Sequence, residues 1–254
     1  MNAAAWAVLG FLLLPLVAIV GASVSDTPYV AFPPVGFTLR WYSLLLQRTD
    51  LLTSFRDSVL IAVLCTVAAT ALGVLAAAGL HRQVWARGAL QALLLSPLIL
   101  PTVVTGVALL QFYYLIDLDA PFAGLLIGHV VITLPYVVRT VGAGLLRLDP
   151  AIPEAAESLG AGPARVLLRV TLPAVAPSIL AAVIFVFVTS FDQATVSLFL
   201  SGPGVVPLPV RILNLIEVGV DPAVAAVSTL LILFAFALVA LLQRLLGLDR
   251  AFDA

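Results

Sequence analysis

The side chains that most often catalyse reactions or bind metals are few in this sequence. The two histidines, His81 and His129, lie on separate apolar segments, and neither stands in an HExxH arrangement. No GxSxG turn is present to expose a nucleophilic serine. Cys65 is the single cysteine, so it has no partner in the chain for a disulfide or a cysteine metal site. We therefore expect neither catalysis nor a metal site.

The basic residues are all arginine, because the sequence contains no lysine. A phosphate-binding loop of the GxxxxGK[ST] type needs a lysine that reaches the β- and γ-phosphates. We therefore expect no cofactor in this subunit; if nucleotide hydrolysis drives it, ATP and Mg²⁺ bind to a separate ATPase. The formal net charge of -1 argues against a nucleic-acid partner, since phosphate neutralisation needs clustered basic residues.

Several polar side chains lie within apolar segments and are candidates for a solute path. Asp192 is the formally charged residue well inside such a segment, and an acid in this position is a functional candidate. At 1.5 Å per residue, Asp192 lies about 28 Å along its helix, near the outer interface. A role in helix packing or in an outer gate is therefore the alternative to a place in the solute path. Gln193 is a further candidate, and so are Gln111 and Thr105, for which bonding to a neighbouring backbone carbonyl is the alternative.

The composition places the elements that carry these residues in a bilayer. The chain has 254 residues, of which 63% are hydrophobic and 10% charged, and its mean hydropathy is +1.20. Six apolar stretches are long enough to cross about 30 Å of hydrocarbon. They lie near 4–24, 58–80, 89–115, 122–143, 174–200 and 223–245. The sequence thus predicts a single all-α membrane domain over 1–254, with a bend in the third span at Pro97 and Pro101.

The arginines indicate the orientation of these spans. A cytoplasmic N-terminus puts eight arginines inside and four outside, as the positive-inside rule favours. The inner ones are Arg82, Arg87, Arg139, Arg147, Arg165, Arg169, Arg244 and Arg250. We expect Arg139 to reach the headgroups by snorkelling, with a cytoplasmic gate as the alternative.

The longest polar inner stretch, 145–173, separates spans four and five. Pro153 suits a first helical position, followed by Glu154 and Glu157 in the opening turn, where the helix dipole favours acids. Gly160 then ends the helix. A second amphipathic piece, around Val166, sets apolar residues against two arginines. A helix resting on anionic headgroups would favour basic residues over glutamates, so this composition favours a protein partner.

This stretch resembles the EAA loop of the permease subunits of ABC importers. The family pattern is Glu-Ala-Ala, three residues, Gly, nine residues and Ile-x-Leu-Pro. Here Glu154-Ala155-Ala156 is followed at that spacing by Gly160 and by Val170-Thr171-Leu172-Pro173, in which valine replaces isoleucine. The resemblance implies a type I importer permease fold in which this loop is a cytoplasmic coupling helix. The coupling residues it implies are Glu154, Ala155, Ala156, Leu159, Gly160, Leu172 and Pro173.

The resemblance also implies partners and a location. The partners are a second six-span permease, an ATPase dimer and a periplasmic or lipoprotein solute-binding protein, with membrane lipid around the spans. The location is the bacterial cytoplasmic membrane, with both termini in the cytoplasm.

Beyond the loop, most of the chain is similar to the second permease of spermidine/putrescine systems. The matching segments include Gly36 to Tyr42 and Ser190-Phe-Asp192-Gln193. Gln193 departs from the family, which often has an acid there, and Asp57 stands where asparagine is common. The resemblance implies transport of polyamines or a related small solute.

Two other functions are alternatives. An ion-coupled secondary carrier would place charges or broken-helix ion sites near the midplane, and this sequence has almost none there. An intramembrane enzyme is disfavoured by the scattered histidines and the missing nucleophile motif.

Overall fold

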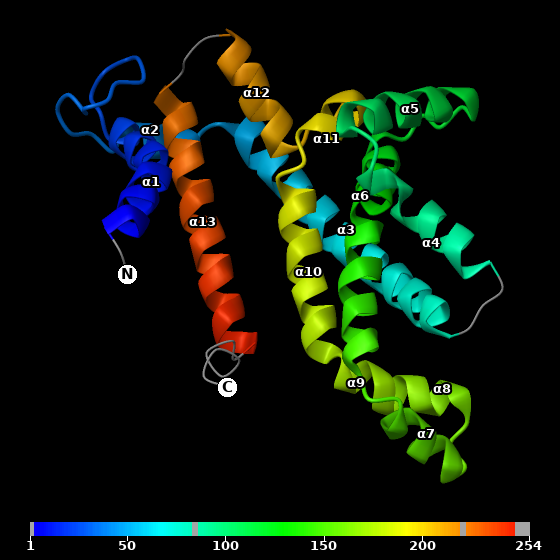
Figure 1. Cartoon of the computed structure of the whole chain (residues 1–254). Helices are drawn as coiled ribbons and strands as arrows, with labels where there is room; N and C mark the ends of the chain where they lie inside the picture. Colours follow the sequence, from blue (N-terminus) through cyan, green and yellow to red (C-terminus); the bar gives the residue numbers. More distant parts are fainter. Residues whose placement is uncertain (1–2, 83–85, 219–221, 247–254) are drawn as a thin grey trace. The chain divides into compact units, whose positions relative to one another are not determined.

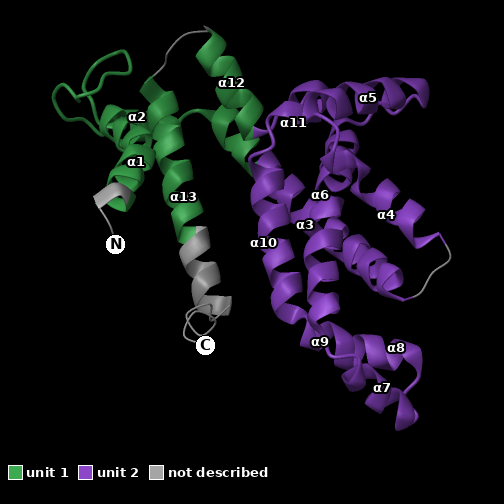
Figure 2. Cartoon of the chain, viewed as in Figure 1, with its two compact units in different colours: residues 1–56, 208–254 green, residues 57–207 purple. Residues whose placement is uncertain are grey.

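The protein is helical throughout the part described by the computed structural model, which covers residues 3–82, 86–218 and 222–246 (Figure 1). The predictions that both chain ends and Arg250 lie on the cytoplasmic side concern residues outside these ranges. An isolated bridge between Gly202 and Val205 is the β-type pairing found in the described part. The chain forms two compact units, one of residues 1–56 and 208–254, the other of residues 57–207 (Figure 2).

The first unit is built around two apolar helices. Helix α1 (Ala3–Ser23) packs against α13 (Pro222–Leu246), which also contacts α2 (Arg40–Leu45). The connection between α1 and α2 is held by Trp41, whose indole N–H donates to the carbonyl of Ser25 at 2.8 Å. Helix α12 (Leu208–Val218) and the first turns of α3 (Thr49–His81) complete this unit.

The second unit carries the predicted site residues. Helix α6 (Pro121–Arg147) packs along α10 (Ala176–Phe191), and α3 contributes its remaining turns. The core between them is formed by small and β-branched side chains, which allow close helix approach: Cys65, Ala69, Val137, Val141, Ala182 and Val186. Gly73 of α3 faces Val137, and a Cβ on that glycine would lie 2.5 Å from the valine Cβ. A side chain at position 73 would therefore force these helices apart.

The segment predicted as the third span is two helices with a sharp bend. Helix α4 (Arg87–Leu95) continues through the 3₁₀ turn η1 (Ser96–Leu98) and meets α5 (Thr102–Leu115) at 102°. Pro101 precedes the first residue of α5, and a proline disfavours α-helical geometry in the residue before it. The bend predicted at Pro97 and Pro101 is thus confirmed, and its angle is larger than a simple kink.

The segment predicted as the fifth span is also interrupted. Helix α10 ends at Phe191, and a short turn separates it from α11 (Thr195–Leu200). Before α10 the chain bends by 73° at Val175, between helical pieces that start at Pro163 and Ala176. Pro177 lies in the first turn of α10, where a backbone N–H would have no acceptor within the helix, so proline is tolerated there.

Three described helices are long and apolar enough to cross a membrane, within the ranges Ala5–Ser23, Thr49–His81 and Pro121–Arg147. The number rises to five if each bent pair is one span, by length and composition alone. The described apolar part of α13, Pro222–Ala237, is shorter. The count of six spans stays a prediction.

Candidate functional site: the segment between α6 and α10

The 145–173 segment is a chain of short helices at the end of α6. Helix α7 (Ala151–Ser158) is followed by α8 (Pro163–Val166), the wide π-type turn η2 (Leu167–Thr171) and α9 (Leu172–Ala174) (Figure 1). These pieces lie together below α6 and α10, at the opposite end of α6 from α5 and α11. The segment therefore forms one end of the second unit.

Helix α7 begins two residues before the position expected from Pro153. The Asp149 carboxylate accepts the backbone N–H of Ala151 at 2.9 Å, and the Asp149 carbonyl accepts that of Ile152. These bonds start the turn early, so Pro153 is the third helical residue, where an N–H would have no helical acceptor in any case. The expected start at Pro153 was wrong, because the Asp149 carboxylate already binds the backbone N–H of Ala151 and so begins the turn earlier.

Gly160 ends α7 in a geometry that most residues resist. Its φ is +85°, and its N–H donates to the carbonyl of Glu157 at 2.9 Å. The next N–H, of Ala161, donates to the carbonyl of Ala156 at 3.1 Å. This pair of bonds is a Schellman motif, which satisfies helix carbonyls that would otherwise lack a donor. The prediction that Gly160 ends the helix is confirmed, and the positive φ is its physical reason.

One face of α7 is apolar and open to the surroundings. Leu159 is 89% exposed and Ile152 is 48% exposed, and the exposed Ala155 lies between them at helical spacing. Glu154 and Glu157 are also exposed, on other faces. Ala156 is half-buried on the side toward the unit. Ile152 was not among the predicted coupling residues, although its spacing of seven from Leu159 places both on one helix face.

The rest of the segment is tied to the core of the second unit. Val166 and Val175 are buried, and Leu172 packs against the core cluster that contains Val175 and Val186. Pro173 is exposed. The second amphipathic piece has the predicted sidedness, because Val166 is buried while Arg165 and Arg169 are exposed. The coupling residues thus divide into a group at α7, exposed except for the half-buried Ala156, and the anchored Leu172, with Pro173 beside it.

The four candidates for a solute path lie on two elements. Asp192 caps the C-terminus of α10 and is exposed, so it ends a helix instead of lying within one; Gln193 follows it in the turn. On α5, Gln111 is exposed, and Thr105 is buried with its hydroxyl 3.4 Å from the carbonyl of Pro101. In the part of the chain that the structure describes, no hydrogen bond joins the α5 pair to the α10 pair.

A buried polar network lies between α6, α10 and α11. His129 is 1% exposed, with Nδ1 2.8 Å from the Ser190 hydroxyl and Nε2 2.9 Å from the Ser197 hydroxyl. Ser197 also donates to the carbonyl of Gln193, so its oxygen must accept from Nε2–H, and Nδ1 then accepts from Ser190. The sequence predicts that His129 lies in a span but gives no signal for these two serine partners, because they lie 61 and 68 residues away along the chain.

The network extends to the single cysteine. The Thr133 hydroxyl donates to the carbonyl of His129 at 2.7 Å, and Cys65 lies 3.3 Å from the Thr133 oxygen. Because the threonine proton is used, the thiol is the donor in that contact. Among the described residues, no group of three His, Cys, Asp or Glu side chains gathers as metal ligands.

Known proteins match both the sequence and the fold. The family model of the binding-protein-dependent transport system inner membrane component matches residues 69–249. The chain belongs to this family. It is therefore a transport permease of the inner membrane, and the predicted membership of the ABC importer permeases is confirmed.

Relatives within the family are similar over most of their length. The chain is 31% identical over 246 residues to the spermidine/putrescine transport system permease protein PotC of Escherichia coli K12, covering 96% of this chain and 92% of that protein. It is 31% identical over 230 residues to the putrescine transport system permease protein PotI of the same strain, covering 87% and 82%. The predicted likeness to the spermidine/putrescine permeases is confirmed.

The fold has a match among solved structures. A bacterial ABC transporter involved in import of the acidic polysaccharide alginate contains a chain that superposes with a TM-score of 0.74 at 16% identity. The match covers 93% of this chain and 90% of that one. At this identity the match concerns the fold alone, and it confirms the predicted all-helical importer permease fold.

Proposed function

We propose that this chain is one of two permeases in an ATP-driven importer and that α7 is its coupling helix. A separate ATPase dimer binds ATP and Mg²⁺, and a solute-binding protein delivers the solute. The lack of lysine supports this division of labour, because the chain has no phosphate-binding loop of its own. With α7 in the cytoplasm and six spans, both termini are cytoplasmic.

The exposed apolar face of α7 carries this proposal. Fully burying a leucine or isoleucine side chain contributes about 1.5–3 kcal/mol, so Leu159 and Ile152 gain free energy when a partner covers them. The small Ala155 between them lets a partner backbone approach closely. Glu154 and Glu157 are exposed on other faces of α7, where they can pair with basic groups of an ATPase.

The anchoring of the segment gives this contact a mechanical consequence. Helix α7 contacts η2, which leads through α9 into α10, and Leu172 and Val175 hold this connection against the core. A displacement of α7 by closure of the ATPase dimer is therefore passed to the base of α10 and to α6 beside it. This is how the chain would alternate access without chemistry of its own.

The solute we propose is a polyamine or a related small cation. The support is the likeness to relatives named for spermidine and putrescine transport, together with exposed Asp192 beside Gln193 at the end of α10. A carboxylate at that end would attract a cationic solute. Gln193 adds hydrogen-bonding groups without a second negative charge.

The test is ATP-driven polyamine uptake by the assembled importer in proteoliposomes. Leu159→Ser should abolish uptake with no effect on membrane insertion, since this side chain makes little contact within the chain. Leu115→Ser is the matched control, because Leu115 is 79% exposed at the end of α5 and belongs to no part of the segment. Normal uptake by the Leu159 variant would refute the proposed coupling. Wild-type uptake that survives vanadate but collapses with an uncoupler would point to an ion-coupled carrier.

A further inference from the structure

The C-terminal half of α6 is flanked by two cavities that contain arginines. The first has a volume of about 250 Å³ and lies between α3, α4 and α6. The second, of about 450 Å³, lies between α6 and the start of α10. Arg139 and Ala143 line both, so the cavities meet at these residues of α6.

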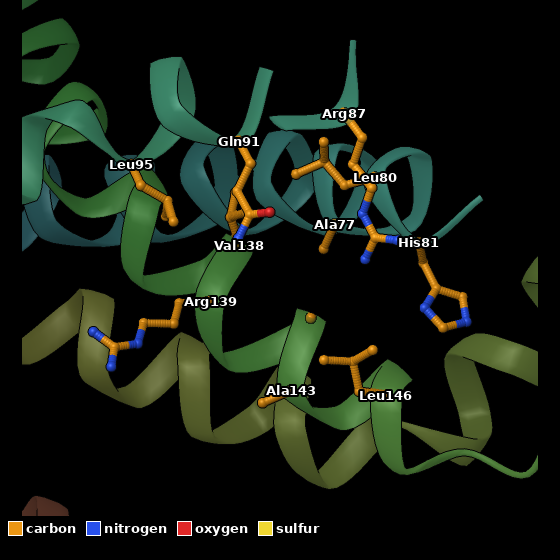
Figure 3. Close-up of a pocket in the computed structure, with 11 residues that line it drawn as sticks. Ala77, Leu80, His81, Arg87, Gln91, Leu95, Val138, Arg139, Ala143 and Leu146 are labelled. Carbon is orange, nitrogen blue, oxygen red and sulfur yellow. The ribbon is translucent and has the colours of Figure 1, made fainter. Parts of the chain in front are cut away.

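The first cavity combines apolar walls with cationic and polar groups. Figure 3 shows Arg87 and Gln91 of α4 pointing into it, with Ala77 and Val138 on its walls. Arg139 extends from α6 away from Ala77 in this view, and the second cavity contains it together with Arg147. Arg87 is thus the arginine whose side chain points into the first cavity.

These arginines have no acidic neighbour at the cavities. Among the described residues that line the two cavities, none is Asp or Glu. Arg87, Arg139 and Arg147 therefore place three positive charges around one helix end without a compensating carboxylate in the lining. Guanidinium groups bind phosphate with two parallel hydrogen bonds, and such charge-assisted bonds are about twice as strong as neutral ones.

We infer that the first cavity binds the headgroup phosphate of an anionic phospholipid from the cytoplasmic leaflet, held by Arg87 with Gln91 as a second donor. The inference rests on the proposed function for its orientation, because α7 and this cavity lie at the same end of α6. Basic pockets between membrane helices on the cytoplasmic side suit anionic headgroups.

The size and walls of the cavity favour a lipid over a free anion. Its volume equals about eight waters at about 30 Å³ each, enough for a phosphodiester and its glycerol but not for acyl chains. The chains would leave past Leu146, which lines the cavity and is 71% exposed. A free phosphate would gain nothing from the apolar walls of Leu80, Leu95 and Leu146.

The experiment is a titration of the purified full-length chain in detergent with phosphatidylglycerol, with bound lipid counted by native mass spectrometry. Arg87→Gln should weaken binding by about tenfold, the effect of losing one charge-assisted contact. Arg82→Gln is the matched control, because Arg82 directly follows α3 and lines neither cavity. We expect the Arg82 variant to bind as the unaltered chain does, and thermal unfolding of both variants verifies their folding.

Three results would overturn the inference. One is equal binding of phosphatidylcholine and phosphatidylglycerol; another is displacement of the lipid by millimolar inorganic phosphate, which would assign the site to a soluble anion. The third is loss of the site in the assembled importer, which would assign the cavity to contact with a partner subunit. All three results come from lipid-binding measurements and none from an uptake assay. The lipid site can therefore be refuted while the coupling role of Leu159 stands, and the coupling role can be refuted while the lipid site stands.

Discussion

The backbone N–H of Ala161 donates to the carbonyl oxygen of Ala156 at 3.1 Å, across the turn that Gly160 makes at the end of α7. This bond requires the positive φ of Gly160, so the direction in which the chain leaves the exposed face of α7 depends on one residue.

Gly160→Ala should weaken the end of α7 and reduce ATP-driven uptake. There is open space for the added methyl, so the cost comes from the left-handed conformation, about 1–2 kcal/mol for an L residue. Gly162→Ala is the control, because that position also has open space and its φ of -69° suits any residue. Hydrogen exchange of the amides in 151–161 measures the loosening. Equal exchange and uptake in both variants would contradict this role of Gly160.

Ser190→Ala should destabilise the protein, because it removes the hydroxyl that donates to His129 Nδ1 in a buried site. Leaving a buried acceptor without a partner costs about 1–3 kcal/mol. Ser43→Ala provides the comparison, since the Ser43 hydroxyl is exposed and donates to the carbonyl of Arg40 within α2. Thermal unfolding in detergent should show a lower midpoint for Ser190→Ala alone. Equal midpoints would mean that the network adds nothing to stability.

Asp192→Asn should raise the KM for uptake of a polyamine. Loss of one charge-assisted contact to a cation corresponds to about a tenfold change in affinity. Asp119→Asn, an exposed acid in the connection between α5 and α6, should leave the KM unchanged. The kinetics are measured with saturating ATP in proteoliposomes. A KM that does not move in the Asp192 variant would remove this residue from the solute path.

The sequence predicted most strongly what depends on local pattern. Gly160 was found as a helix end because glycine accepts a positive φ, and the sidedness around Val166 followed from the spacing of apolar residues. The bend after α4 was predictable from Pro97 and Pro101, since prolines restrict the residue before them.

What the sequence missed depends on contacts between distant elements or on a single side chain. The end of α10 before Asp192 has no proline or glycine to mark it, so the segment was taken as one continuous span. The sequence gives Ser190 and Ser197 no feature that marks them as partners of His129, because only the fold brings these three residues together. The exposure of Ile152 and Leu159 likewise needs the three-dimensional structure, because the same apolar spacing is typical of a buried face.

The central claim is that an ATPase covers the apolar face of α7, and a single added thiol tests it. Cys65 is the single native cysteine and is fully buried, so in Leu159→Cys the new thiol is the accessible one. Its rate of modification by a maleimide is measured in the isolated chain and in the purified importer complex, with Leu115→Cys as the reference. We predict that the complex slows modification at position 159 by about tenfold or more while position 115 reacts equally in both, since a buried interface excludes the reagent. Equal rates at position 159 with and without the ATPase would contradict the claim.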